Sequence, residues 1–213
     1  MIKVLIVDDH ELVRMGIRRL LADESGLSVI GEAADGEQAI QLCKELKPDV
    51  VLMDANMPGI NGLEATKRLL RQDPDVKVIA VTVHGQEPFP SRFIQAGAHG
   101  YLTKGADVNE MVKAIQQVKA GQRYITPEVA QALALQSLGG EDNPFKALSE
   151  REMQVLLMIT SGLKVQEISD KLFLSPKTVN TYRYRLFEKL KVNSDVELTH
   201  LAIRHNLLDS EIL

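Results

Sequence analysis

The first 120 residues alternate short apolar runs with longer segments in which apolar residues recur every three or four positions. A short apolar run bounded by polar residues predicts a buried strand, and the three- to four-residue spacing predicts an amphipathic helix. Regular alternation of the two is typical of βαβ units, which build a parallel sheet covered by helices on both faces. We therefore predict five helices and five strands, at residues 2–7, 27–33, 49–53, 77–82 and 100–103.

The pattern changes after Gly121. A helical segment begins after Pro127, and the cluster GGEDNP that follows it is rich in turn-forming residues and marks a linker. From Phe145 onward the sequence contains no β-rich run, and four helical segments follow one another. We predict a doubly wound α/β domain over residues 1–120, a linker over 121–144 with a helix near 127–138, and an all-α domain over 145–213.

Composition excludes several classes of protein. Hydrophobic residues make up 45% of the chain and charged residues 25%, as in ordinary globular proteins, and no apolar run is long enough to span a membrane. The N-terminal sequence MIKVLIVDDH lacks the features of a signal peptide, so we expect a cytoplasmic protein. The single cysteine, Cys43, cannot form an internal disulfide, and its helical context predicts a buried structural side chain.

The net charge of −4 is distributed unevenly. Residues 1–144 hold 15 basic and 20 acidic side chains, whereas residues 145–213 hold 10 and 9. Between Lys171 and Lys191 there are six basic residues and one acidic residue, Glu188. A local basic stripe on an acidic protein predicts that this one element has an anionic partner.

Polar side chains stand where the predicted strands of the first domain end. Ligands of open parallel sheets bind beyond the carboxyl ends of the strands, so these residues are expected to meet. Three carboxylates in one crevice repel each other unless a cation offsets their charge, and an oxygen-only ligand set favours Mg²⁺. The residues are Asp8 and Asp9 after the first strand, Asp54 after the third, Thr82 at the end of the fourth and Lys104 just beyond the fifth.

This set of residues suits phosphoryl transfer. A carboxylate beside Mg²⁺ and a lysine can attack phosphorus to give an aspartyl phosphate, because such a transfer needs mainly alignment and charge neutralisation. Lys104 supplies a compact positive charge for Asp54 and for a phosphoryl oxygen, and Thr82 supplies a hydroxyl donor. We therefore predict that a carboxylate of this set is reactive toward phosphorus.

The same residues resemble the receiver domain of two-component response regulators, through VDDH, LMDANMPGINGLE, VIAVT and GYLTKGA. The resemblance covers residues 1–120 and implies a flavodoxin-like sheet with strand order 2-1-3-4-5. It implies phosphorylation of Asp54, a phosphoryl group held by Lys104 and Thr82, and a switch aromatic at Tyr101. It implies that Mg²⁺ is bound by Asp9, Asp54 and the main-chain carbonyl of Asn56, with Asp8 assisting through the water shell of the metal.

The helices of the second domain follow the order of a helix-turn-helix, whose second helix enters the major groove of DNA. Ser175 at the capping position and Pro176 at the first helical position mark the start of that helix. Lysine and arginine suit phosphate contacts, whereas asparagine and threonine can read base edges. The predicted DNA-binding residues are Lys177, Thr178, Asn180, Thr181, Tyr184 and Arg185.

The stretch from Leu148 to Val192 closely resembles the LuxR-type helix-turn-helix, so the whole chain resembles the NarL/FixJ class of regulators, most strongly its global activators. The resemblance implies phosphorylation by a sensor histidine kinase or its phosphotransfer module, dimerisation when phosphorylated, and activation of transcription by RNA polymerase, including transcription of small regulatory RNA genes. Ala55 departs from the pattern, since relatives more often carry a larger aliphatic residue there. We assign no role to His84.

Two other functions fit parts of the pattern. A phosphatase of the haloacid dehalogenase type uses an aspartate nucleophile followed two residues later by a second aspartate, and here that position is Asn56. We therefore expect no enzymatic activity beyond phosphorylation and dephosphorylation of the chain itself. A receiver that signals through protein contacts without binding DNA is the other alternative, and the basic stripe opposes it.

Overall fold

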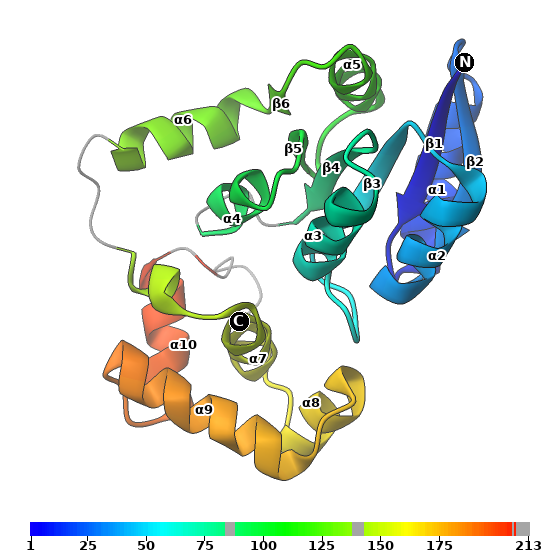
Figure 1. The fold of residues 1–213 in the computed structure, drawn as a ribbon. Helices are drawn as coiled ribbons and strands as arrows, with labels where there is room; N and C mark the ends of the chain where they lie inside the picture. Colours follow the sequence, from blue (N-terminus) through cyan, green and yellow to red (C-terminus); the bar gives the residue numbers. More distant parts are fainter. Residues whose placement is uncertain (84–87, 138–142, 206, 208–213) are drawn as a thin grey trace. The chain divides into compact units, whose positions relative to one another are not determined.

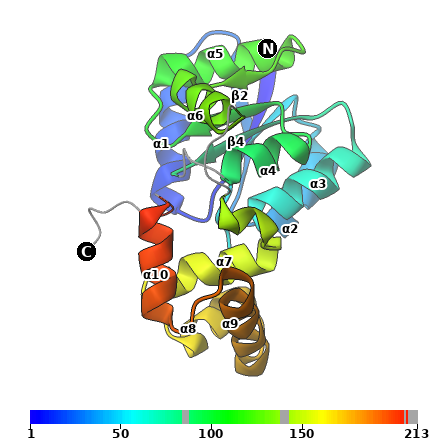
Figure 2. The same cartoon turned by 90° about the vertical axis from the view of Figure 1, so that its left-hand side faces the viewer.

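The computed structural model describes residues 1–83, 88–137, 143–205 and 207 of the 213-residue chain (Figures 1 and 2). Contacts within the chain separate two compact units, the first of which ends at Ser137. His84 and residues 138–142 of the predicted linker lie outside the described residues. The predicted boundaries at residues 120 and 144 stay predictions. None of the described helices is both long and apolar enough to cross a membrane.

The first unit is built on a parallel sheet in the order β2-β1-β3-β4-β5-β6. The predicted order of the first five strands is confirmed, but the predicted number of strands was too low. The sixth strand pairs with β5 over only two residues, too few to produce a recognisable alternation in the sequence. The strands are β1 (Ile2–Val7), β2 (Leu27–Ala33), β3 (Val50–Asp54), β4 (Lys77–Thr82), β5 (Gly100–Thr103) and β6 (Tyr124–Ile125).

Helices cover both faces of this sheet (Figure 1). One core lies between the sheet and α1 (Glu11–Ala22) with α5 (Val108–Lys119), and a second core lies under α2 (Gly36–Leu46) and α3 (Gly62–Gln72). The near-continuous Val, Ile and Leu of the central strands supply both cores, as expected of a sheet buried on two sides. The remaining helices of the unit, which contact each other, are α4 (Phe89–Gln95) and α6 (Pro127–Ser137).

The start of α3 lies against the end of β3. The side chain of Asn61 caps the helix by accepting a hydrogen bond from the main-chain N–H of Glu64 at 2.8 Å. A Cβ atom at Gly62 would lie 1.8 Å from the main-chain oxygen of Asp54, so only glycine allows this approach. The loop after β3 therefore turns tightly into α3 and leaves Asp54 at the edge of the sheet.

In its described residues, the second unit contains a short 3₁₀ helix, η1, and the four α-helices that the sequence pattern predicted. Ser149, Ser175 and Ser194 cap α7, α9 and α10, and Ser149 forms the predicted capping box with Glu152. The core is formed by buried aliphatic residues of all four α-helices. The elements are η1 (Pro144–Ala147), α7 (Glu150–Thr160), α8 (Val165–Leu172), α9 (Pro176–Leu190) and α10 (Asp195–Arg204).

Candidate functional site

A lysine ammonium is shared by two buried carboxylates at the C-terminal edge of the sheet. Nζ of Lys104, just after β5, lies 2.6 Å from Oδ2 of Asp8 and 3.2 Å from Oδ2 of Asp54. Asp8 follows β1 and is 2% exposed, and Asp54 ends β3 and is 3% exposed. The three strand ends therefore converge, because the carboxyl ends of parallel strands lie at one edge of the sheet.

Burial makes the charge of Asp54 costly. It raises the pKa of this carboxyl from the ordinary 3.8 to about 6; the positive charge of Lys104 opposes the rise, and Asp8 adds to it. The main-chain N–H of Asn56 also donates to the carboxylate and lowers its pKa. For Lys104, burial by itself would lower the pKa, but Asp54 and Asp8 outweigh it and the pKa is raised. At neutral pH the site therefore holds an ionised, poorly solvated carboxylate beside a fixed cation.

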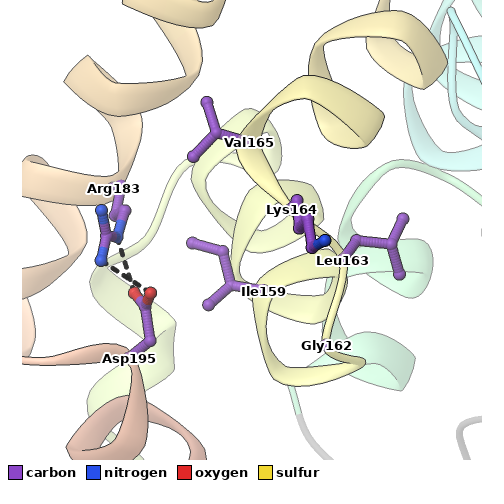
Figure 3. Close-up of a pocket in the computed structure, with 7 residues that line it drawn as sticks. All are labelled: Ile159, Gly162, Leu163, Lys164, Val165, Arg183 and Asp195. Carbon is purple, nitrogen blue, oxygen red and sulfur yellow. Dashed lines mark hydrogen bonds and ion pairs between the residues drawn. The ribbon is translucent and has the colours of Figure 1, made fainter.

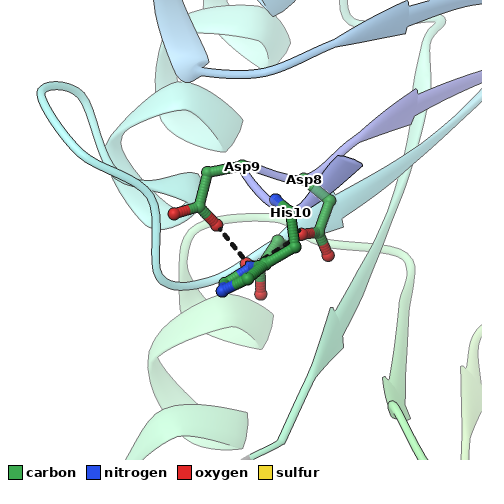
Figure 4. A group of neighbouring side chains, drawn as sticks. Asp8, Asp9 and His10 are labelled. Atoms are coloured by element: carbon green, nitrogen blue, oxygen red, sulfur yellow. Dashed lines mark hydrogen bonds and ion pairs between the residues drawn. The ribbon is translucent and has the colours of Figure 1, made fainter. Parts of the chain in front are cut away.

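Asp9 and His10 complete an acidic cluster at this edge (Figure 4). Nδ1 of His10 lies 2.9 Å from Oδ1 of Asp9 and 3.1 Å from Oδ1 of Asp8. Candidate ligand atoms of Asp8, Asp9, His10 and Asp54 all lie within 4.8 Å of one another, a spacing that could hold a metal ion. His10 is not among the predicted site residues, although its position directly after Asp8 and Asp9 could have indicated that it lies in the cluster.

Thr82 and Tyr101 are both completely buried next to this edge. The main-chain oxygen of Thr82 accepts a hydrogen bond of 2.7 Å from the N–H of Lys104, which ties the end of β4 to the residue after β5. The ring of Tyr101 packs edge-on against Phe93 of α4, with ring centroids 6.0 Å apart. Tyr101 thus occupies an inward position between β5 and α4.

The helix α9 presents a polar face to solvent. Val179, Leu186 and Leu190 are buried on its inner side. Of the six residues predicted to bind DNA, Thr178 and Asn180 are partly buried. The other four are exposed: Lys177, Thr181, Tyr184 and Arg185. The structure therefore places all six on or beside the accessible side of one helix.

Two residues of the basic stripe form pairs within the domain. Arg183 donates through Nε and Nη2 to the two carboxylate oxygens of Asp195 on α10, at 2.7 Å each. This pair lines a cavity of about 400 Å³ beside Ile159 and Val165 (Figure 3). Lys189 lies 2.7 Å from Oε2 of the buried Glu152. These two charges are paired within the domain, so fewer cations of α9 are available to an anionic partner than the sequence indicated.

Comparison with known families identifies both parts of the chain. Residues 4–116 match the response regulator receiver domain, and residues 146–202 match the luxR family of bacterial regulatory proteins. The chain belongs to the response regulators that join a receiver to a LuxR-type DNA-binding domain. It is 64% identical to the response regulator GacA of Pseudomonas aeruginosa, over 99% of each chain. It is 58% identical to the response regulator UvrY of Escherichia coli K12, over 100% of this chain and 99% of UvrY.

Solved structures give the same result. The response regulator RcsB of Salmonella typhimurium is 27% identical over 93% of this chain and 95% of RcsB, with a TM-score of 0.73. RcsB from Salmonella enterica serovar Typhimurium bound to the promoter P1flhDC, in the presence of phosphomimetic BeF₃⁻, covers 94% of this chain and 97% of RcsB. That pair is 28% identical, with a TM-score of 0.70. The predicted fold class and the predicted class of regulator are therefore confirmed.

Proposed function

We propose that this response regulator accepts a phosphoryl group on Asp54 and, when phosphorylated, binds promoter DNA through α9 to activate transcription. The observation that carries the proposal is the ammonium of Lys104, shared by the buried carboxylates of Asp8 and Asp54. A lysine already in contact with the acceptor can pair with a phosphoryl oxygen as the transfer proceeds, without a rearrangement of the backbone.

The acidic cluster fits Mg²⁺. Asp8, Asp9 and Asp54 bring carboxylate oxygens close together, and Mg²⁺ prefers oxygen ligands from one or two carboxylates with water and phosphate. The main-chain carbonyl of Asn56 is the fourth group that we assign to the metal site. Bound Mg²⁺ would supply the positive charge that three acids and one lysine lack. It would also compete with His10, which contacts two of the same carboxylates.

The remaining residues have separable roles in the transfer. A carboxylate oxygen of Asp54 attacks the phosphorus of a phosphohistidine in a sensor kinase or its phosphotransfer domain; the P–N bond breaks, and the leaving imidazole takes up a proton. Lys104 and the hydroxyl of Thr82 hold the phosphoryl oxygens. Thr82 and Tyr101 then favour one of two pre-existing conformations of the receiver. Hydrolysis of the acyl phosphate by water resets the site, so the chain acts as an enzyme only on itself.

DNA recognition is assigned to the exposed face of α9. Lys177 and Arg185 contact phosphates, and Thr178, Asn180 and Thr181 read base edges together with Tyr184. RcsB, solved on promoter DNA, supports this assignment by its similarity to the chain. Two copies are required to place two α9 helices in half-sites one helical turn apart, so phosphorylation favours a dimer that recruits RNA polymerase in the cytoplasm. We also propose that its targets include small regulatory RNA genes, as the resemblance of the sequence to global activators implies.

Labelling with a small phosphodonor tests the acceptor. Acetyl phosphate with Mg²⁺ should phosphorylate the wild type and leave Asp54→Asn unlabelled. Asp49→Asn is the matched control, because Asp49 precedes the same strand at the opposite edge, where it pairs with Lys119 at 2.6 Å. We expect the control to be labelled like the wild type. Labelling that survives in Asp54→Asn would refute the proposal.

DNA binding tests the output. Fluorescence anisotropy with promoter DNA should show tighter binding by the phosphorylated wild type than by the unphosphorylated protein. Asp54→Asn should show no such increase after the same treatment. Equal affinity of phosphorylated and unphosphorylated wild type, at two salt concentrations, would contradict control of α9 by Asp54.

A further inference from the structure

The turn that carries Asp8 and Asp9 is held by an arginine that binds its backbone. Nη1 of Arg14, on α1, donates a hydrogen bond of 2.7 Å to the main-chain oxygen of Asp8. The side chain of Arg14 is only 15% exposed. That oxygen belongs to the planar peptide unit between Asp8 and Asp9. The hydrogen bond therefore fixes the orientation of this peptide unit.

A glutamate on the edge strand holds Arg14 in turn. Nε of Arg14 lies 3.5 Å from Oε2 of Glu32, and Arg18, one turn later on α1, donates to Oε1 of Glu32 at 2.6 Å. Glu32 thus receives two guanidinium groups from the same helix. Of these two arginines, it is Arg14 whose guanidinium also donates a hydrogen bond to the backbone of Asp8.

A bulge in β2 is the reason that Glu32 faces α1. Val4 pairs with Val29, but Leu5 pairs with Gly31, so Ile30 is an extra residue in the ladder. Before the bulge, Leu27 packs in the core beneath α1 and α5, whereas Ala33 after it packs in the other core. The alternation of side chains is therefore reversed after Ile30, and Glu32 lies on the face that α1 covers.

We propose that Arg14, oriented by Glu32, is a positioning residue for Mg²⁺ at Asp8 and Asp9. The inference rests on the proposed function of this site and adds a residue outside the predicted set. The main-chain N–H of Asp8 also donates to Ala33 of β2 at 3.1 Å, so the turn is fastened to β2 directly and through Arg14. Arg14 is the part of this support that a side-chain substitution can remove.

Two possible roles of Arg14, positioning the metal ligands or only adding positive charge, predict opposite effects of its removal on the affinity for Mg²⁺. A guanidinium near three carboxylates repels a metal cation, so removal of its charge should tighten Mg²⁺ binding if charge were its whole contribution. If Arg14 holds the Asp8–Asp9 peptide in the orientation that binds the metal, its removal should weaken binding. Substitution of groups that orient metal ligands typically lowers affinity by about 10- to 100-fold.

The experiment compares Arg14→Met with Arg18→Met in the full-length protein. Both substitutions remove one positive charge and one contact with Glu32 from the same helix, but only Arg14→Met also removes the hydrogen bond to the backbone of Asp8. Amide chemical shifts followed by NMR during titration with MgCl₂ give the dissociation constant without any phosphodonor. We expect the dissociation constant for Mg²⁺ to increase about tenfold in Arg14→Met. In Arg18→Met we expect it to stay within about twofold of the wild-type value.

A second variant, Arg14→Lys, tests whether weaker binding in Arg14→Met reflects only a loss of folding. Arg14→Lys keeps a donor near Asp8 but cannot bridge to Glu32 at the same time, so we expect an increase of about threefold in the dissociation constant. In phosphorylation assays, both Arg14 variants should need more Mg²⁺ for half-maximal rate, while the rate at saturating Mg²⁺ stays within about twofold of wild type.

The outcomes separate the two proposals. A wild-type protein that shows no Mg²⁺-dependent shifts near Asp8 and Asp9 would refute the metal site of the proposed function. Mg²⁺ binding by wild type that is unchanged or tighter in both Arg14 variants would overturn only the positioning role. An equal weakening in Arg18→Met would also overturn it, because the effect would then follow the pairing of α1 with Glu32 and not the contact of Arg14 with the backbone of Asp8.

Discussion

Replacement of Asp54 by asparagine should stabilise the receiver at neutral pH in the absence of Mg²⁺. Asparagine has nearly the shape of aspartate but carries no charge, so the variant removes a buried carboxylate that is poorly solvated. Lys104 does not lose its pairing, because Asp8 remains 2.6 Å away. The substitution that removes the proposed acceptor should therefore increase the free energy of unfolding.

The magnitude follows from the pKa of Asp54. Its value of about 6 in the folded chain exceeds the ordinary 3.8, so between these values the folded state binds more protons and stability falls as pH rises. At 1.4 kcal/mol per pH unit, the charged carboxylate costs about 3 kcal/mol above pH 6. That pKa already includes the attraction of Lys104, so the expected gain for Asp54→Asn is about 3 kcal/mol.

Urea unfolding followed by circular dichroism measures this gain with a chelator present. At pH 7.5 the unfolding midpoint of the receiver should rise, and at pH 4 the difference from wild type should shrink to a few tenths of a kcal/mol, because wild-type Asp54 is then protonated when folded. Added Mg²⁺ should stabilise the wild type more than the variant. A variant no more stable than wild type at pH 7.5 would refute the reasoning, as would a gain that persists at pH 4.

Asp49→Asn is again the control, and here we expect the opposite change in the free energy of unfolding. Lys119 and the main-chain N–H of Lys3 outweigh burial and lower the pKa of Asp49. Its charge therefore contributes stability above its unfolded-state pKa, and this contribution is lost as pH falls through the lower folded-state pKa. Asp49→Asn should lower stability at pH 7.5, where Asp54→Asn raises it.

Three further predictions follow from charges within the two units. Because the pKa of Asp54 is raised to about 6, the rate of labelling at low Mg²⁺ should fall as pH decreases through 6, and saturating Mg²⁺ should shift the fall to lower pH, as a rate–pH profile would show. Lys189→Met leaves the buried Glu152 with only its capping hydrogen bond from Ser149 and should lower the free energy of unfolding of the DNA-binding domain by about 2 kcal/mol in urea titrations. Arg185→Met should reduce the slope of log affinity for DNA against log salt by about one, whereas Arg183→Met should reduce it less and lower the melting temperature instead.

Controls for these predictions come from exposed charges. Removal of the partly exposed Glu64–Arg68 pair by Arg68→Met should cost less than about 1 kcal/mol, in contrast to Lys189→Met. A labelling rate that does not change between pH 7.5 and 5 at low Mg²⁺ would contradict the raised pKa of Asp54. Equal salt slopes for Arg183→Met and Arg185→Met would mean that the Asp195 pair opens when DNA binds.

The receiver site was largely predictable because its geometry follows from topology. Once five parallel strands are recognised, the residues that end them must meet at one edge, so the strand order alone predicts that Asp8, Asp54 and Lys104 lie together. Helix starts were predictable for a similar reason, since a serine at the capping position acts over only three residues. Both signals are local in sequence or fixed by the order of elements.

Features that depend on a single long-range partner were not predictable. The two-residue strand β6 has no pattern of its own, and the bulge at Ile30 changes the face of Glu32 without changing the composition of β2. Arg183 belongs by sequence to the basic stripe, and only the packing of α10 reveals that Asp195 neutralises it. In each case the deciding contact comes from another element, and the periodicity of one segment carries no information about it.

The balance of charge distinguishes the receiver site from the structural ion pairs of the same chain. In the second unit, Arg183 pairs with one carboxylate and Lys189 with another, as expected where the role is to fix helices. At the edge of the sheet, Lys104 faces two buried carboxylates, with Asp9 and a histidine beside them. A site selected for stability would not keep this excess of negative charge, because burial raises its cost. The excess suits the phospho-acceptor role that we propose for Asp54, since a divalent cation could bind among these carboxylates and offset their charge.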